Sequence, residues 1–169
     1  FKHCCVPLQH TVNTVLLIQM SFNTHSLSTS TLNNSMQDAY VQAFVQLATS
    51  AREETGIELP AHIEHYVVCL LAVHVDKTDF LPTHTFAHSL LMMQRSRNAK
   101  ELGDTCLFVT SVFPTYGVNE RYYTDIGVTA YNSINTELFQ TISVHFETVK
   151  TFARYACRGA NTDATSLLT

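Results

Sequence analysis

The sequence predicts an all-α protein, a single-domain bundle of about six helices that are mostly antiparallel between neighbours. Apolar residues recur with the 3.6-residue period of a helix in successive segments, which short breaks at glycine and proline separate. No segment of convincing length alternates apolar and polar residues as a strand does, and no internal repeat occurs. At 169 residues, 46% of them hydrophobic, the chain suffices for one domain with a sizeable core and is too short for us to expect two.

Residues 1–34 are expected to be disordered or not part of the native protein. Residues 1–19 carry no helical stripe of useful length and do not begin with methionine, which makes Met20 a candidate initiator. The apolar run at 15–18 is too short to cross a bilayer, which takes about 20 apolar residues. We therefore expect no membrane span.

The helical domain is expected at residues 35–159, and its first part should hold three helices. The first begins at Ser35 and ends at Gly56, a residue type that often terminates helices. The second begins at Pro60, because proline at a first helical position loses no helical hydrogen bond. The third follows Pro82.

The central helix should begin at Asn98, which can form a reciprocal cap with Glu101, and should stop before Pro114. It is apolar around most of its circumference, so we expect burial on more than one side. A helix rich in tyrosine should follow, capped by Asn119 and running to about Ile134.

A final long helix is expected from Thr136 to Gly159, because apolar residues keep a period of 3.6 along this segment. The last residues, 160–169, should be frayed. The predicted loops are as short as helix connections in bundles usually are.

Gly103 and Asp104 interrupt the apolar surface of the central helix. A glycine inside a helix costs roughly 1 kcal/mol relative to alanine, and a carboxylate beside an apolar face needs hydrogen-bond donors. Both are expected where a neighbouring helix packs closely, and we expect Asp104 to meet Tyr123 or Tyr131 there. The sequence thus predicts a structural hub of Gly103, Asp104, Tyr123, Gly127 and Tyr131.

Three strings in the second half of the chain follow one another in a distinctive order, LGDTCLF at 102–108, RYYTDIGVTAY at 121–131 and LFQTISVHF at 138–146. They resemble a family of small uncharacterised bacterial helical proteins with the pattern L-G-D-x-x-L-F, Y-Y-x-x-x-G-x-x-A-Y, L-F and a late F. The resemblance covers about half the chain, from residue 99 to 146, and implies a helical fold in a soluble bacterial protein. It implies no activity and no catalytic residues. Where the family has an Arg shortly before the Leu-Gly-Asp, this chain has Lys100, which weakens any idea of a fixed Arg–Asp pair.

Charge and cysteine spacing exclude several kinds of site. A formal net charge of −4 and a pI near 6.1 argue against nucleic-acid binding, which needs clustered Lys and Arg. The five cysteines lack the C-x-x-C spacing of zinc knuckles and thioredoxins. We interpret Cys69, Cys106 and Cys157 as buried thiols in a reducing, cytoplasmic compartment. A nucleophilic Cys106 beside a histidine is the alternative.

Nine histidines raise the hypothesis of a metal site. His62 and His65 lie three residues apart and His84 and His88 four, spacings that place two imidazoles on one helix face. There is, however, no H-E-x-x-H motif and no Glu-x-x-His pair of the di-iron kind. We interpret these residues as surface histidines and expect no cofactor.

Two functions fit the sequence. The first is a non-enzymatic interaction or structural module that binds a protein partner or a second copy of itself. The second is a small-molecule or metal-dependent enzyme centred on Asp104, with Tyr122, Tyr123, Tyr131 and a histidine as partners. The enzyme requires a concave pocket that reaches Asp104, whereas the module predicts a sealed Asp104 and an apolar patch elsewhere. In the absence of a catalytic motif, we expect the interaction module.

Overall fold

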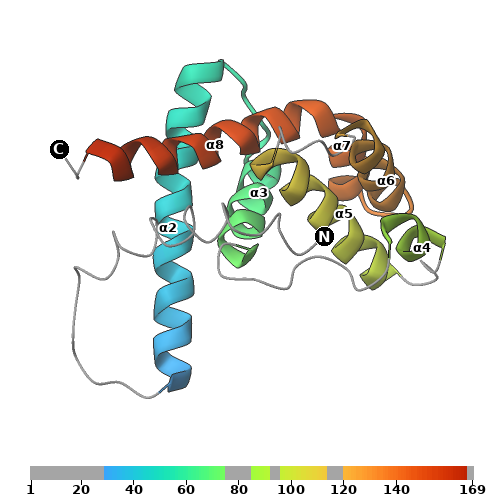
Figure 1. Cartoon of the computed structure of the whole chain (residues 1–169), viewed down its shortest axis with the longest axis horizontal. Coiled ribbons are helices and arrows are strands. Elements are labelled where there is room, and N and C mark those ends of the chain that lie inside the picture. Colours follow the sequence, from blue (N-terminus) through green and yellow to red (C-terminus); the bar gives the residue numbers. More distant parts are fainter. Residues whose placement is uncertain (1–28, 75–84, 92–95, 114–119, 167–169) are drawn as a thin grey trace.

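Helices are the regular elements of the part of the chain that the computed structural model describes, residues 29–74, 85–91, 96–113 and 120–166 (Figure 1). These ranges contain no strand, which confirms the predicted all-α class. The seven helices are α2 (Thr29–Thr55), α3 (Ala61–His74), α4 (Phe86–Leu91), α5 (Ser96–Val112), α6 (Glu120–Asn132), α7 (Glu137–Val144) and α8 (Phe146–Ser166). None of these described helices has the length and hydropathy that a membrane crossing requires.

Glycine and proline bound the first two helices as predicted. Gly56 follows α2 with φ of 66°, a left-handed conformation that glycine adopts at low cost, and its N–H donates to the Arg52 carbonyl at 2.9 Å. α3 begins directly after Pro60. The start of α2 differs, because the helix begins at Thr29 and so extends into the segment 1–34 that we expected to be disordered.

The start of the central helix was predicted at the wrong residue. α5 begins at Ser96, so Asn98 lies inside the helix and does not cap it with Glu101. The predicted cap of α6, Asn119, lies outside the described residues. The difference at the start of α5 is at a helix end, where local sequence signals are weakest.

The predicted last helix is in fact two helices, which explains why seven are found where about six were expected. The chain turns at His145, which has φ of −105° and ψ of 24°, and α8 then continues to Ser166, into the predicted frayed tail. This turn lets Phe139 of α7 and Phe146 of α8 pack on one ring, that of Tyr131, at centroid distances of 5.4 Å and 6.2 Å. This shared packing of three aromatic rings stabilises the junction of α6, α7 and α8.

α5 occupies the centre of the fold and packs against α3, α4, α6 and α8, while α2 packs against α3 and α8. In Figure 1, α8 crosses α2, and the first turns of α2 extend beyond the other helices. The main core lies where α2, α3, α5 and α8 meet, and its largest fully buried side chains include Tyr40, Leu71, Leu107 and Phe152. A smaller core of Phe86, Leu102, Cys106, Ile126 and Ala130 joins α4, α5 and α6.

Candidate functional site

Asp104 is 7% exposed on α5 and collects three donors from its own chain. The Tyr131 hydroxyl donates to Oδ1 at 2.8 Å, and the Tyr66 hydroxyl donates to the same oxygen. The Lys100 ammonium lies 2.6 Å from Oδ2. The expected contact with Tyr131 is confirmed. We call these four residues the Asp104 cluster.

Two glycines allow the close helix approach that the cluster needs. A Cβ on Gly103 would lie 2.7 Å from the ring of Tyr131, and a Cβ on Gly127 would lie 2.8 Å from the ring of Phe146 and 2.9 Å from Cys106 Cβ. Non-bonded carbon atoms do not approach so closely without strain. Gly103 and Gly127 therefore serve packing, as the sequence predicted.

Tyr122 and Tyr123 lie beside α4 and not beside Asp104. The Tyr123 ring packs edge-on against Phe86 of α4 at 4.6 Å, and the Tyr122 hydroxyl accepts a hydrogen bond from the Ala87 N–H at 3.1 Å. Along α6, Tyr123 lies about 12 Å from Tyr131 at the helical rise per residue. The structure thus does not bring these two candidate partners to Asp104, because they point to α4.

Sequence reasoning missed two members of the cluster. Lys100 was taken as a reason to doubt a fixed pair with Asp104, yet it lies one helical turn before Asp104 on α5 and forms an ion pair with it. The other missed member is Tyr66 on α3. It lies on the inner side of α3, among aliphatic residues of the main core. A phenol in such a place usually finds a hydrogen-bond partner. This signal was available in the sequence, but it does not say which acceptor, 38 positions along the chain, the hydroxyl meets.

The two phenols of the cluster act as hydrogen-bond donors. Burial, followed by the neighbouring Asp104 carboxylate, raises the pKa of Tyr66 and of Tyr131 well above its ordinary value. Both hydroxyls therefore keep their protons at neutral pH. The Lys100 ammonium also lies 5.2 Å from the centre of the Tyr66 ring, a cation–π arrangement. The cluster is thus a hydrogen-bonded network that joins α3, α5 and α6.

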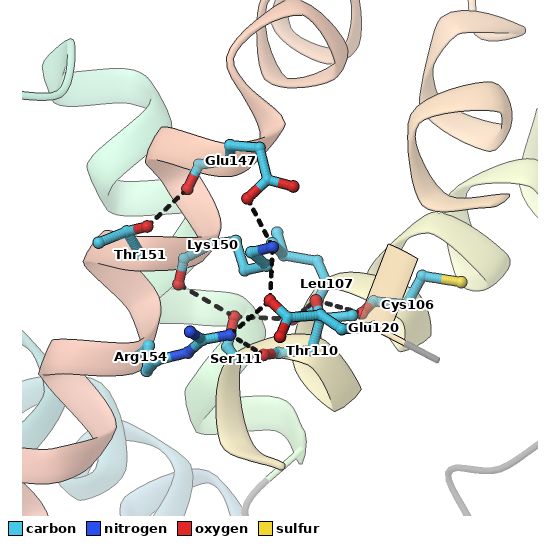
Figure 2. Close-up of polar contacts among 9 residues, drawn as sticks. All are labelled: Cys106, Leu107, Thr110, Ser111, Glu120, Glu147, Lys150, Thr151 and Arg154. Atoms are coloured by element: carbon cyan, nitrogen blue, oxygen red, sulfur yellow. Dashed lines mark hydrogen bonds and ion pairs between the residues drawn. The ribbon is translucent and has the colours of Figure 1, made fainter. Parts of the chain in front are cut away.

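A second polar cluster joins α8 to the end of α5 and the start of α6, as Figure 2 shows. The Lys150 ammonium, on a side chain only 4% exposed, lies 2.7 Å from Glu120 and 2.5 Å from Glu147. Arg154 donates to Glu120 and to the Thr110 carbonyl, both at 2.8 Å. The hydrogen bond from Lys150 is the main reason why the pKa of Glu120 lies below its ordinary value. The charges of the two cations and the two carboxylates cancel. We call Glu120, Glu147, Lys150 and Arg154 the clamp, because their contacts connect α8 to α5 and α6.

The described histidines of the predicted sites do not gather into a metal centre within the part of the chain that the structure describes. His62 and His65 are exposed on α3 and His88 is exposed on α4, whereas His84 lies outside the described residues. Within the described part of the chain, no group of three or more His, Cys, Asp or Glu residues could hold a metal ion.

The thiol that lies beside a histidine is Cys69. Its Sγ is 3.6 Å from Nε2 of the exposed His65, one helical turn away, and Cys69 itself is partly exposed. Cys106, the predicted alternative, is fully buried in the smaller core, and burial raises the pKa of its thiol. The i, i+4 spacing of His65 and Cys69 could have revealed this pair in the sequence.

An open depression of about 210 Å³ lies between α2 and α3. Its lining combines apolar side chains with an ion pair between Arg52 and Glu64 at 3.4 Å. No member of the Asp104 cluster lines it. We call its lining the α2–α3 face, which consists of Val45, Arg52, Leu59, Ala61, Glu64, His65 and Val68.

No protein-family model matches the chain, and neither a curated protein nor a solved structure matches it. The resemblance of residues 99–146 to a family of bacterial helical proteins therefore stays a prediction.

Proposed function

We propose that the protein is a helical interaction module and that it pairs with a second copy of itself through the α2–α3 face. The observation that carries the proposal is the contrast between two regions. The polar groups of the Asp104 cluster are engaged with one another, whereas the α2–α3 face combines an open depression with exposed apolar side chains.

The composition of this face supports docking of another protein surface. Val68 of the lining is 2% exposed, whereas Val45 is 44% exposed on α2. Arg52 and Glu64 also belong to the lining. Protein interfaces commonly place apolar side chains at the centre and charged groups around them.

The charges of the face favour a second copy as the occupant. The face carries one cation, Arg52, and one anion, Glu64, and their side chains keep 44% and 21% of their surface exposed. In a two-fold symmetric pair, the same patch meets itself, so Arg52 of each copy can approach Glu64 of the other. Because the two charges cancel, the face does not repel its own image.

The test is the mass of the protein in solution. Sedimentation of the full chain over a concentration series should show a monomer–dimer equilibrium, and Val45→Glu should shift it to the monomer, because a charge would be buried without a partner. The control is Val144→Glu, since Val144 is 77% exposed on α7 and lies outside this face. A parent protein that stays monomeric at all concentrations, or an equal effect of both substitutions, would overturn the proposal.

A further inference from the structure

We infer that His65 and Cys69 are half of a zinc site, and that a second copy of the chain supplies the other half as a His₂Cys₂ set across the α2–α3 face. The inference rests on the self-association proposed above. It adds a ligand to that interface and assigns a role to two side chains that are one helical turn apart on α3.

The distance between the two donor atoms fits zinc. Tetrahedral zinc binds cysteine sulfur at about 2.3 Å and histidine nitrogen at about 2.0–2.1 Å, which separates the two donors by about 3.6 Å. The Sγ of Cys69 lies 3.6 Å from Nε2 of His65. The pair therefore already has the spacing of two ligands of one ion.

Both residues are accessible to an ion and to a second chain. His65 is exposed and lines the depression, and Cys69 is partly exposed one turn further along α3. Val73 follows after another turn and is 41% exposed, so the stripe continues as an apolar edge. A second copy that docks on the α2–α3 face would approach this stripe.

The number of ligands calls for the second copy. Structural zinc sites take four protein ligands, and the described residues of one chain contain no group of three that could hold a metal. A two-fold axis beside α3 doubles the pair to four. On binding, each Cys69 thiol releases its proton to solvent and binds as the thiolate, with no change in oxidation state.

The experiment titrates the reduced full chain with zinc, and in parallel with cobalt, whose tetrahedral thiolate complexes absorb visibly. Isothermal titration and sedimentation should give one zinc per two chains and a rise in the dimer fraction. Cys69→Ser and His65→Gln should each lose the cobalt band and the effect of zinc on the dimer. Two control variants should keep the cobalt band and the effect of zinc on the dimer. They are Cys157→Ser and the double variant Cys4→Ser, Cys5→Ser.

The outcomes separate this inference from the proposed function. The zinc site is wrong if the dimer persists in EDTA and zinc either does not bind or binds Cys69→Ser as well as the parent. The proposed self-association is then still supported. Zinc bound through Cys69 and His65 by a monomer overturns the shared site. Absence of a dimer with and without zinc overturns both proposals.

Discussion

At the scale of single residues, the polar groups of the Asp104 cluster stabilise the fold. Asp104 would be unfavourable in a dry helix packing surface, yet the Tyr66 and Tyr131 hydroxyls and the Lys100 ammonium compensate for its desolvation. The raised pKa values of the two phenols extend to more alkaline pH the range in which their hydroxyls stay protonated and can donate. The carboxylate is thus engaged within its own chain, and Asp104 is only 7% exposed.

Replacing Asp104 by alanine tests this network. Asp104→Ala should lower the free energy of unfolding by about 1–3 kcal/mol, because it leaves the buried hydroxyl of Tyr131 and the partly buried hydroxyl of Tyr66 without their acceptor. Urea unfolding followed by circular dichroism measures the change. Asp125→Ala is the matched control, because Asp125 is 71% exposed and its only recorded ion pair among the described residues, with Arg121, spans 3.9 Å. Equal unfolding curves for both variants would refute the role of the cluster.

At the scale of the helices, two glycines decide how α5, α6 and α8 pack. Gly103, in the middle of α5, meets Tyr131 near the end of α6. Cys106, about one turn later on α5, meets Gly127, about one turn earlier on α6, so α5 and α6 run in opposite directions. This pairing places Tyr131 next to Asp104 and Tyr123 near Phe86. The register of one helix pair thus selects which tyrosine joins the cluster.

Gly103→Ala separates helix propensity from packing. Alanine gains roughly 1 kcal/mol of propensity in a helix interior, whereas overpacking against a buried ring costs about 1–3 kcal/mol or more. We expect a net loss of stability, because the added Cβ would lie 2.7 Å from the Tyr131 ring. The control in the same helix is Asn98→Ala, at an exposed position where only the propensity gain applies. Thermal melting in which Gly103→Ala is as stable as Asn98→Ala would contradict the packing argument.

At the scale of the whole molecule, the clamp of Figure 2 connects the last helix to the middle of the chain. Glu120 opens α6, and Lys150 and Arg154 reach it from α8. A buried ammonium such as that of Lys150 is tolerated only while its carboxylate partners are ionised. The packing of α8 is therefore coupled to the charge of Glu120.

This coupling predicts a dependence of stability on pH. The pKa of Glu120 is lower in the folded protein than the reference value of 4.5. Ionised Glu120 therefore contributes to the free energy of unfolding above about pH 4.5, and this contribution is lost as the pH falls through the folded pKa. Glu120→Gln should be less stable than the parent at pH 7, and the difference should shrink in acid. Urea unfolding between pH 7 and 3 measures it, with Glu53→Gln, an exposed position on α2, as the control. A difference that stays constant with pH would refute the clamp.

What the sequence by itself determined is local. Gly56 and Pro60 mark the boundary of α2 and α3 because backbone geometry acts within a few residues, and the 3.6-residue period identifies the all-α class for the same reason. The i, i+4 contact of His65 and Cys69 is equally local. Gly103 and Asp104 predicted a close and polar packing site, but they did not predict which other residues form it.

Only the tertiary structure decided which distant groups meet and which remain exposed. Tyr66 reaches Asp104 from another helix, and the turn at His145 interrupts a segment whose apolar period runs on unbroken. Both depend on how side chains of several helices fill one core, and that energy is a sum over contacts between segments far apart in the chain. For the same reason, the exposure of the α2–α3 face, on which the proposed self-association depends, follows from where the other helices pack.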